Sequence, residues 1–178
     1  MRNQPTFAFK KRAFFAICML LLSVNILTAQ ENGYYEIKAN LISDDNSPSN
    51  TDNSREAFYN LILNLHPTAY VENSAIKIGG NSGYSNLPIL KLTFHDTKSF
   101  SILNQANAQY NDVELMTIKV LTVADLNNRL NLVDVGNLNQ LKYIYIECYF
   151  DCTESQLKGF ITYDNPNIRI FYKVSKPS

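Results

Sequence analysis

The sequence predicts an α/β domain built around a parallel sheet, and three observations support this fold class. Short apolar segments with strand-like alternation recur at a spacing of about 26 residues in the second half of the chain. Segments with a helical apolar period separate them. The composition, with 46% hydrophobic and 12% aromatic residues, is that of a globular domain. The 178-residue chain is therefore long enough to bury a core without metal or disulfide support.

The first thirty residues have the three zones of a secretory signal peptide. A basic stretch ends at Arg12, an apolar run of about twelve residues follows, and a small residue, Ala29, precedes Gln30. A membrane span needs roughly twenty apolar residues, so this run is too short for an anchor. We expect residues 1–30 to be a signal peptide cleaved near Gln30. The remainder, 31–178, is then a single secreted or periplasmic β/α domain with no membrane association.

The charge of the mature chain argues against a nucleic-acid partner. The whole chain is neutral, with 16 Lys and Arg against 16 Asp and Glu, but residues 1–30 hold four basic and no acidic side chains. The mature part therefore has 12 basic and 16 acidic residues and a net charge near −4. Neutralising phosphates requires a basic face, and an acidic domain offers no excess of such groups.

The mature chain begins with a predicted strand, a loop and a helix. Residues 34–42 are rich in aromatic and β-branched side chains, which favours a strand. Residues 44–54 are polar and contain a proline, so we expect an exposed loop there. A helix should then begin near residue 53 and end before Pro67, and a short strand should follow at 75–78. The apolar face of this helix would be formed by Phe58, Leu61, Ile62 and Leu65.

Four apolar sets mark the predicted strands of the second half. They are Ile89, Leu92 and Phe94; Leu115, Ile118 and Val120; Leu141, Ile144 and Ile146; and Ile170 and Tyr172. In each of the first three sets, the last two residues belong to one strand face and the first marks the turn into the strand.

Helical periods occupy the segments between these strands. Two of them begin with a capping pair, in which Thr122 precedes Asp125 and Thr153 precedes Gln156 by three residues. The predicted buried positions are Phe100, Leu103 and Tyr110; Val123, Leu126, Leu130 and Val133; and Leu157, Phe160 and Ile161.

Alternating strands and helices predict a parallel sheet with right-handed crossovers. Two architectures satisfy this pattern. One is a short solenoid of repeated β/α units with a period of about 26 residues, and the alternative is a small doubly wound α/β sheet. The fixed period favours the solenoid, because each unit is then a copy of one supersecondary element.

The segment Leu138-x-x-Leu141-x-x-Ile144-x-Ile146 resembles a leucine-rich repeat. The resemblance extends over residues 87–175. The asparagine that the family places after the strand is missing, since Thr97, Val123 and Tyr149 stand at that position. Proteins of this family bind partners on a concave strand face, so the resemblance implies a binding function for the exposed face of the sheet.

The residues that alternate with the buried positions form three predicted rows across this face. Their aromatic and cationic side chains suit the binding of a protein or a glycan. If helices cover the face, as in a doubly wound sheet, the same residues are core. The rows are Lys91, Thr117, Tyr143 and Arg169; Thr93, Lys119, Tyr145 and Phe171; and His95, Leu121, Glu147 and Lys173. The candidate binding residues are Lys119, Tyr143, Tyr145, Arg169 and Phe171.

The cysteines predict one local disulfide. Cys18 leaves with the signal peptide, so Cys148 and Cys152 remain in a protein expected to reach an oxidising compartment. Two sulfurs without a neighbouring histidine are too few for a metal site, and no metal is expected.

His95 supports the alternative function, a small exported α/β enzyme such as a hydrolase. It stands with Asp96 at a predicted strand end, where α/β enzymes place catalytic groups. No nucleophile motif or paired carboxylates accompany it, so we assign no catalytic residue and expect no cofactor. The leading hypothesis is an exported, non-catalytic protein that holds a protein or glycan partner on its strand face.

Overall fold

The fold is an α/β arrangement around a seven-stranded sheet. The computed structural model describes residues 33–37, 53–79, 87–105, 107–133, 138–162, 165 and 167–175, all within one compact unit, Asn32–Ser178. The strand order is β1-β7-β6-β5-β4-β2-β3, and neighbouring strands are parallel except for β2 and β3. The strands are β1 (Tyr34–Glu36), β2 (Thr68–Glu72), β3 (Ala75–Gly79), β4 (Lys91–Phe94), β5 (Leu115–Val120), β6 (Tyr143–Cys148) and β7 (Arg169–Val174).

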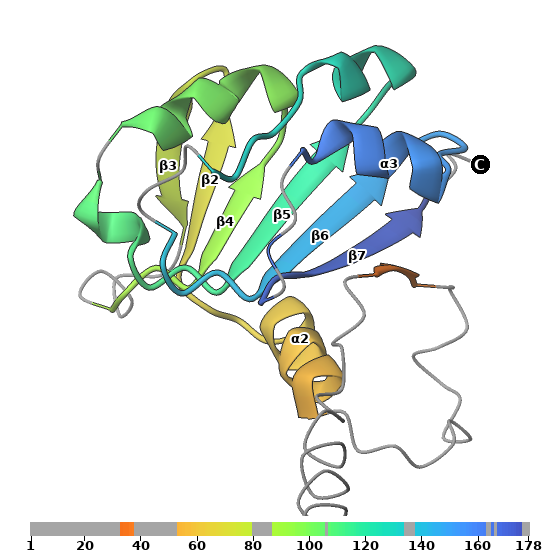
Figure 1. Ribbon diagram of the computed structural model, residues 1–178. Coiled ribbons are helices and arrows are strands. Elements are labelled where there is room, and N and C mark those ends of the chain that lie inside the picture. The colour runs from red at the N-terminus through yellow and green to blue at the C-terminus, as the bar shows by residue number, and fades with distance from the viewer. Residues whose placement is uncertain are drawn as a thin grey trace, which may run out of the picture. The chain divides into compact units, whose positions relative to one another are not determined.

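The connections that follow β4, β5 and β6 carry helical segments on one side of the sheet (Figure 1). Each connection moves the chain by one strand in the same direction. Right-handed crossovers that all step in one direction lie on one face, which explains this arrangement. The segments are the 3-10 helices η4 (Thr97–Asn104), η5 (Ala108–Tyr110) and η6 (Val123–Asn127) and the α-helix α3 (Glu154–Phe160).

The helix α2 (Asn53–Leu63) lies on the opposite face (Figure 1). It connects β1, which pairs with β7 at one edge, to β2 near the other edge, so the chain crosses the sheet in the reverse direction. A right-handed crossover in the reverse direction places its helix on the other face. The face that the later connections leave open is therefore partly covered by a helix from the N-terminal part of the domain.

Two hydrophobic cores lie on the two faces of the sheet. On the α3 face, strand residues such as Leu92, Ile118 and Ile144 belong to a large cluster that includes Leu103 of η4 and Leu157 of α3. This cluster supplies most of the buried apolar surface that stabilises the sheet. The second cluster, between the sheet and α2, is smaller and consists of Ile37, Phe58, Leu61, Leu115, Tyr143, Tyr145 and Phe171.

The predicted α/β fold is confirmed, with a sheet that is parallel except for the β2–β3 pair, but the spacing of paired residues along the chain has no fixed period. The four predicted strands of the second half are β4 to β7, and they are neighbours in chain order. The paired residues Leu92, Met116, Ile144 and Ile170 are successively 24, 28 and 26 residues apart. The connections also differ in kind, since 3-10 segments follow β4 and β5 and an α-helix follows β6. Equal units of 26 residues therefore do not describe the sheet.

Some local predictions are wrong. The strand predicted at 34–42 is present at Tyr34–Glu36 and has ended at Ile37, and positions 38–42 lie outside the described residues; β2, which starts directly after Pro67, is not among the predicted strands. Leu65 is 87% exposed, because α2 ends before it. Val123 and Val133 are also exposed, since a short 3-10 segment with three residues per turn replaces the expected α-helix.

Two predictions concern parts of the chain outside the described residues. These are the signal peptide at residues 1–30 and the polar loop at 44–54, of which only the last two positions are described, as the start of α2. Within the described part of the chain, we find no helix with the length and apolar character needed to cross a membrane.

Candidate binding groove on the strand face

The strand face opposite α3 carries the five candidate binding residues, in rows that differ from the predicted ones. Relative to the prediction, β5 is shifted by two residues along its neighbouring strands. Leu115 therefore pairs with Lys91 and Tyr143, where Thr117 was expected. Thr117 in turn pairs with Thr93 and Tyr145, where Lys119 was expected. A shift of two keeps every side chain on its face. The observed rows are Lys91, Leu115, Tyr143 and Arg169; Thr93, Thr117, Tyr145 and Phe171; and Lys119, Glu147 and Lys173.

Three of the five candidate residues are buried, although the binding hypothesis placed them on an exposed strand face. Tyr143, Tyr145 and Phe171 are 5%, 7% and 4% exposed, because α2 packs on this part of the face. Phe58 of α2 stacks on Phe171 with ring centroids 3.9 Å apart, and its ring meets those of Tyr143 and Tyr145 edge to face. These side chains form the second core, where each buried aromatic contributes a large apolar area.

The spacing of apolar residues in α2 explains this docking. Phe58 and Leu61 are three residues apart, so they lie on one side of the helix, and both are buried. Ile62 is half-buried at the border of the helix and the sheet. The helix ends at Leu63, which is exposed. One short helix with two anchoring side chains covers only part of the sheet.

The uncovered part of the face forms a groove of about 220 Å³ beside α2. Ile62 of α2 and Leu115 lie where the groove meets the second core. The remaining lining side chains come from β2, β4, β5 and β6 and are hydroxyl-bearing or charged, namely Thr68, Tyr70, Lys91, Thr93, Thr117, Lys119, Tyr145 and Glu147. We call this the strand-face groove. It holds two of the five candidate residues, Lys119 and Tyr145.

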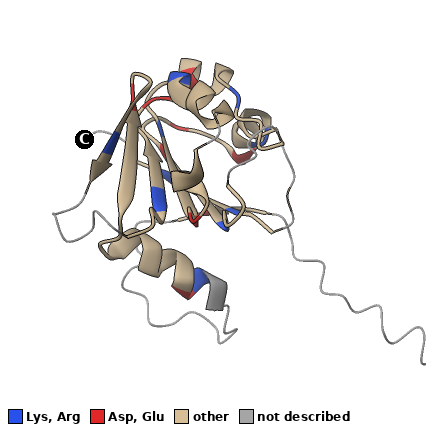
Figure 2. Cartoon of the chain, turned by 90° about the vertical axis from the view of Figure 1, so that its left-hand side faces the viewer, with Lys and Arg blue, Asp and Glu red and all other residues tan. Residues whose placement is uncertain are grey.

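Two lysines in the strand-face groove are not paired with a carboxylate of the described residues. Lys91 is half-buried, and desolvation lowers the pKa of its ammonium group. Neither Lys91 nor Lys119 lies within ion-pair distance of a described acidic group, whereas Lys142 and Lys158 do. Figure 2 shows basic positions on strands of the sheet. The groove therefore presents ammonium groups that a bound anion would neutralise.

The hydroxyl of Tyr145 stays protonated over the physiological pH range. Burial raises its pKa far above the ordinary value, and the nearby charge of Glu147 adds to the effect. Tyr149 has its pKa raised by the same two causes, and its hydroxyl lies 3.5 Å from Oε2 of Glu147. The tyrosine hydroxyls near Glu147 are therefore neutral hydrogen-bonding groups.

The other candidate residues lie apart from this groove. Arg169 and Phe171 line a second hollow of about 300 Å³ with residues of β1 and Arg55 of α2. Tyr143 belongs to the second core. The packing of α2 thus divides the predicted binding face, and the structure does not bring the five candidate residues together in one site.

His95 and Asp96 do not form a catalytic pair with a described nucleophile. Asp96 is the N-cap of η4, and its carboxylate accepts hydrogen bonds from the backbone N–H groups of Asn73 at 2.8 Å and Ser99 at 2.9 Å. The hydroxyl of Ser99 also donates to Asp96 and is buried. The ring of His95 lies 5.8 Å from that of Tyr70. Asp96 therefore has a structural role in the turn after β4.

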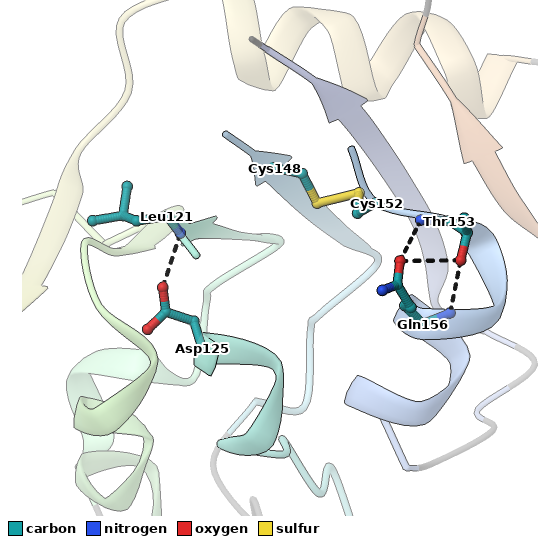
Figure 3. The surroundings of a disulfide bond; sticks show 6 residues. All are labelled: Leu121, Asp125, Cys148, Cys152, Thr153 and Gln156. Atoms are coloured by element: carbon teal, nitrogen blue, oxygen red, sulfur yellow. Dashed lines mark hydrogen bonds between the residues drawn. A yellow bond between two sulfur atoms is a disulfide. The ribbon is translucent and has the colours of Figure 1, made fainter. Parts of the chain in front are cut away.

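The predicted disulfide is confirmed, and it closes the turn between β6 and α3 (Figure 3). Cys148 is the last residue of β6, and Cys152 directly precedes Thr153, the N-cap of α3. The predicted capping box is also present, since Gln156 accepts a hydrogen bond from the Thr153 N–H at 2.9 Å. On the neighbouring connection, Asp125 accepts from the Leu121 N–H at 3.0 Å (Figure 3). The disulfide and the cap fix the end of β6 beyond Glu147.

One wall of the groove, formed by β2, was not predicted from the sequence. Tyr70 and Thr68 belong to β2, the strand that was not predicted. Thr68, Ala69, Tyr70 and Val71 alternate in side-chain character, which is the signal that would have identified this strand.

Neither a metal-binding cluster among the described residues nor a similar known protein indicates a function for this site. No group of three or more described His, Cys, Asp or Glu side chains is placed to hold a metal ion. Comparisons with protein-family models, curated protein sequences and solved structures found no match to this chain.

Proposed function

We propose that this chain is an exported, non-catalytic binding protein that holds a protein or glycan partner on the open part of its strand face. The observation that carries the proposal is the strand-face groove, with its hydroxyl-bearing and charged lining. Small-molecule and glycan sites are concave and combine an apolar surface with a few polar groups that fix orientation. Here Ile62 and Leu115 supply the apolar part.

Export is supported by the sequence pattern of residues 1–30 and by the disulfide. Structural disulfides persist in secreted and periplasmic proteins and are rare in reducing compartments. The Cys148–Cys152 bridge is consistent with that destination.

The resemblance to leucine-rich repeats stays part of the proposal. It is supported by strands β4 to β7, which pair in parallel and in chain order. Helical connections on one face and a strand face on the other are features of such repeats, in which 3-10 segments are common. The unequal sequence distances and the covering helix α2 are features of this chain that a regular horseshoe does not have.

A substitution that fills the groove tests the proposed function. Thr117 lies in the middle of the groove, between the neighbouring residues Thr93 and Tyr145. The protein obtained by expressing the full chain would be screened against arrays of glycans and of extracellular proteins. For any partner found, we expect Thr117→Trp to weaken binding at least tenfold, since the indole occupies the groove.

Ser101→Trp is the matched control. Ser101 is an exposed residue of η4, on the side of the sheet opposite the groove. A partner that loses affinity for Thr117→Trp and keeps it for Ser101→Trp supports the proposal. A partner that binds both variants as tightly as the unsubstituted protein contradicts the proposed site, provided that both variants unfold at an unchanged temperature.

A further inference from the structure

Lys91 is the most unusual charged residue of the strand-face groove. It lies on β4 between Thr68 of β2 and Leu115 of β5, so its neighbours in the sheet are uncharged. It is half-buried, and among the described residues no carboxylate lies within ion-pair distance. Removing an ammonium group from water costs free energy unless an opposite charge or hydrogen-bond acceptors offset the loss. An anionic ligand would provide that offset.

Lys119 provides a second ammonium group farther along the same groove. It is four residues beyond Leu115 on β5, and Leu115 pairs with Lys91. Strand geometry then places the two lysine Cα atoms roughly 14 Å apart. Thr93 and Thr117 occupy the row between them. The groove thus has a cation toward each end and hydroxyl groups in the middle.

Glu147 forms no ion pair with Lys119, although the two residues are register partners on β5 and β6. The carboxylate of Glu147 instead lies 3.5 Å from the hydroxyl of Tyr149. Glu147 therefore adds a hydrogen-bond acceptor at the Lys119 end, while the two lysines give the groove an excess of positive charge.

The lining favours a saccharide over a peptide. The backbone groups of β2, β4, β5 and β6 are engaged in the sheet, so a peptide that crossed this face would not find strand hydrogen bonds. Threonine and tyrosine hydroxyls, by contrast, match the hydroxyl groups of a sugar ring. Tyr70 is 40% exposed at the β2 wall and offers an aromatic surface to the apolar face of a sugar.

We propose that the strand-face groove binds an acidic saccharide. Its carboxylate or sulfate groups contact Lys91 and Lys119, and its hydroxyl groups contact the hydroxyls of Thr93 and Thr117, which lie between the two lysines. This inference rests on the proposed function, because it names the ligand class for the same groove. The two sources of negative charge, uronic acid and sulfate ester, share the chemistry that the lysines recognise.

Isothermal titration calorimetry with matched probes tests the proposal. Oligogalacturonate would be compared with its methyl ester, which keeps the sugar and removes the charge, and dextran sulfate with dextran. Oligoglutamate serves as the acidic peptide. We expect at least one acidic saccharide to bind, with its neutral counterpart weaker by at least about tenfold. Oligoglutamate should bind more weakly than that saccharide, and the preference between uronate and sulfate identifies the source of charge.

Two charge-matched double variants locate the site. Lys91→Gln with Lys119→Gln should weaken binding of the acidic saccharide by about thirtyfold, because hydrogen bonds to charged groups are lost at both ends. Lys98→Gln with Lys158→Gln lowers the net charge equally at η4 and α3, on the opposite face, and should leave affinity within about twofold. Thermal unfolding verifies that both variants fold.

The outcomes separate this inference from the proposed function. If no acidic saccharide binds, or if both double variants lose affinity equally, the inference is overturned. If neutral and acidic saccharides bind alike and Thr117→Trp still blocks them, the acidic ligand is wrong and the binding groove stands. If oligoglutamate binds more tightly than every saccharide, the ligand is an acidic peptide and the inference is wrong. Saccharide binding that Thr117→Trp leaves unchanged contradicts the groove itself.

Discussion

The contact between α2 and the sheet depends on Phe58, and replacing this residue with alanine tests the packing argument. Phe58 is completely buried, stacks on Phe171 at 3.9 Å and meets Tyr143 and Tyr145 edge to face. Truncation of a buried phenylalanine costs about 3–5 kcal/mol. Each aromatic pair adds about 0.5–1.5 kcal/mol beyond the buried area. We therefore expect Phe58→Ala to lower the free energy of unfolding by about 4 kcal/mol.

Urea denaturation followed by circular dichroism measures this loss. With a urea m-value of about 2 kcal/mol per molar, the midpoint should fall by about 2 M. Leu63→Ala is the matched control in the same helix, because Leu63 is 62% exposed. Its effect should stay within about 0.5 kcal/mol.

Hydrogen exchange of the α2 amides gives a second readout, because the helix can open without unfolding the sheet. Phe58→Ala should increase exchange in α2 more than in β5 and β6. A loss below about 1 kcal/mol, together with unchanged protection of α2, would refute the argument that Phe58 anchors the helix to the sheet.

Two further predictions concern the turns that follow β6 and β4. The disulfide closes a short loop, so replacing both Cys148 and Cys152 with alanine should cost about 2 kcal/mol in urea denaturation; free thiols in the purified protein would contradict the bridge. Burial of Asp96 opposes ionisation, but hydrogen bonds from Asn73 and Ser99 outweigh burial and hold its pKa below the ordinary value. Its contribution to stability is thus present above pH ~4 and is lost as the pH falls through the folded-state pKa. Asp96→Ala should therefore cost about 1 kcal/mol at neutral pH and less below pH ~4, and an equal cost at both would be inconsistent with an ionised cap.

Local patterns were sufficient to predict the strands of the second half. Residues such as Ile144 and Ile146 alternate with Tyr143 and Tyr145, and a strand with two apolar faces follows from that pattern. The capping box at Thr153 is also local, because the residues that make it are three positions apart. Such features depend on nearby sequence only.

Coverage of the strand face could not be predicted in the same way. Tyr143 and Tyr145 suit either a binding surface or a core, because a tyrosine ring is apolar and its hydroxyl is polar. The choice depends on α2, which comes some eighty residues earlier in the chain and contacts them through Phe58. The offset of β5 likewise depends on the lengths of the connections, which the apolar pattern does not contain.

The position of β1 has a consequence for the order in which the domain is completed. Strands β5, β6 and β7 each pair with the strand that directly precedes them in the chain, so they can be added to β4 one after another. The N-terminal β1 pairs with the C-terminal β7, and Phe58 of α2 stacks on Phe171 of β7. A chain that emerges from its N-terminus therefore presents these two segments first and docks them last, after the longest loop in the domain has closed. Until β7 is in place, Phe58 of α2 lacks its stacking partner Phe171, so the tyrosine-bearing face of β6 is less firmly covered and more exposed to association with other chains.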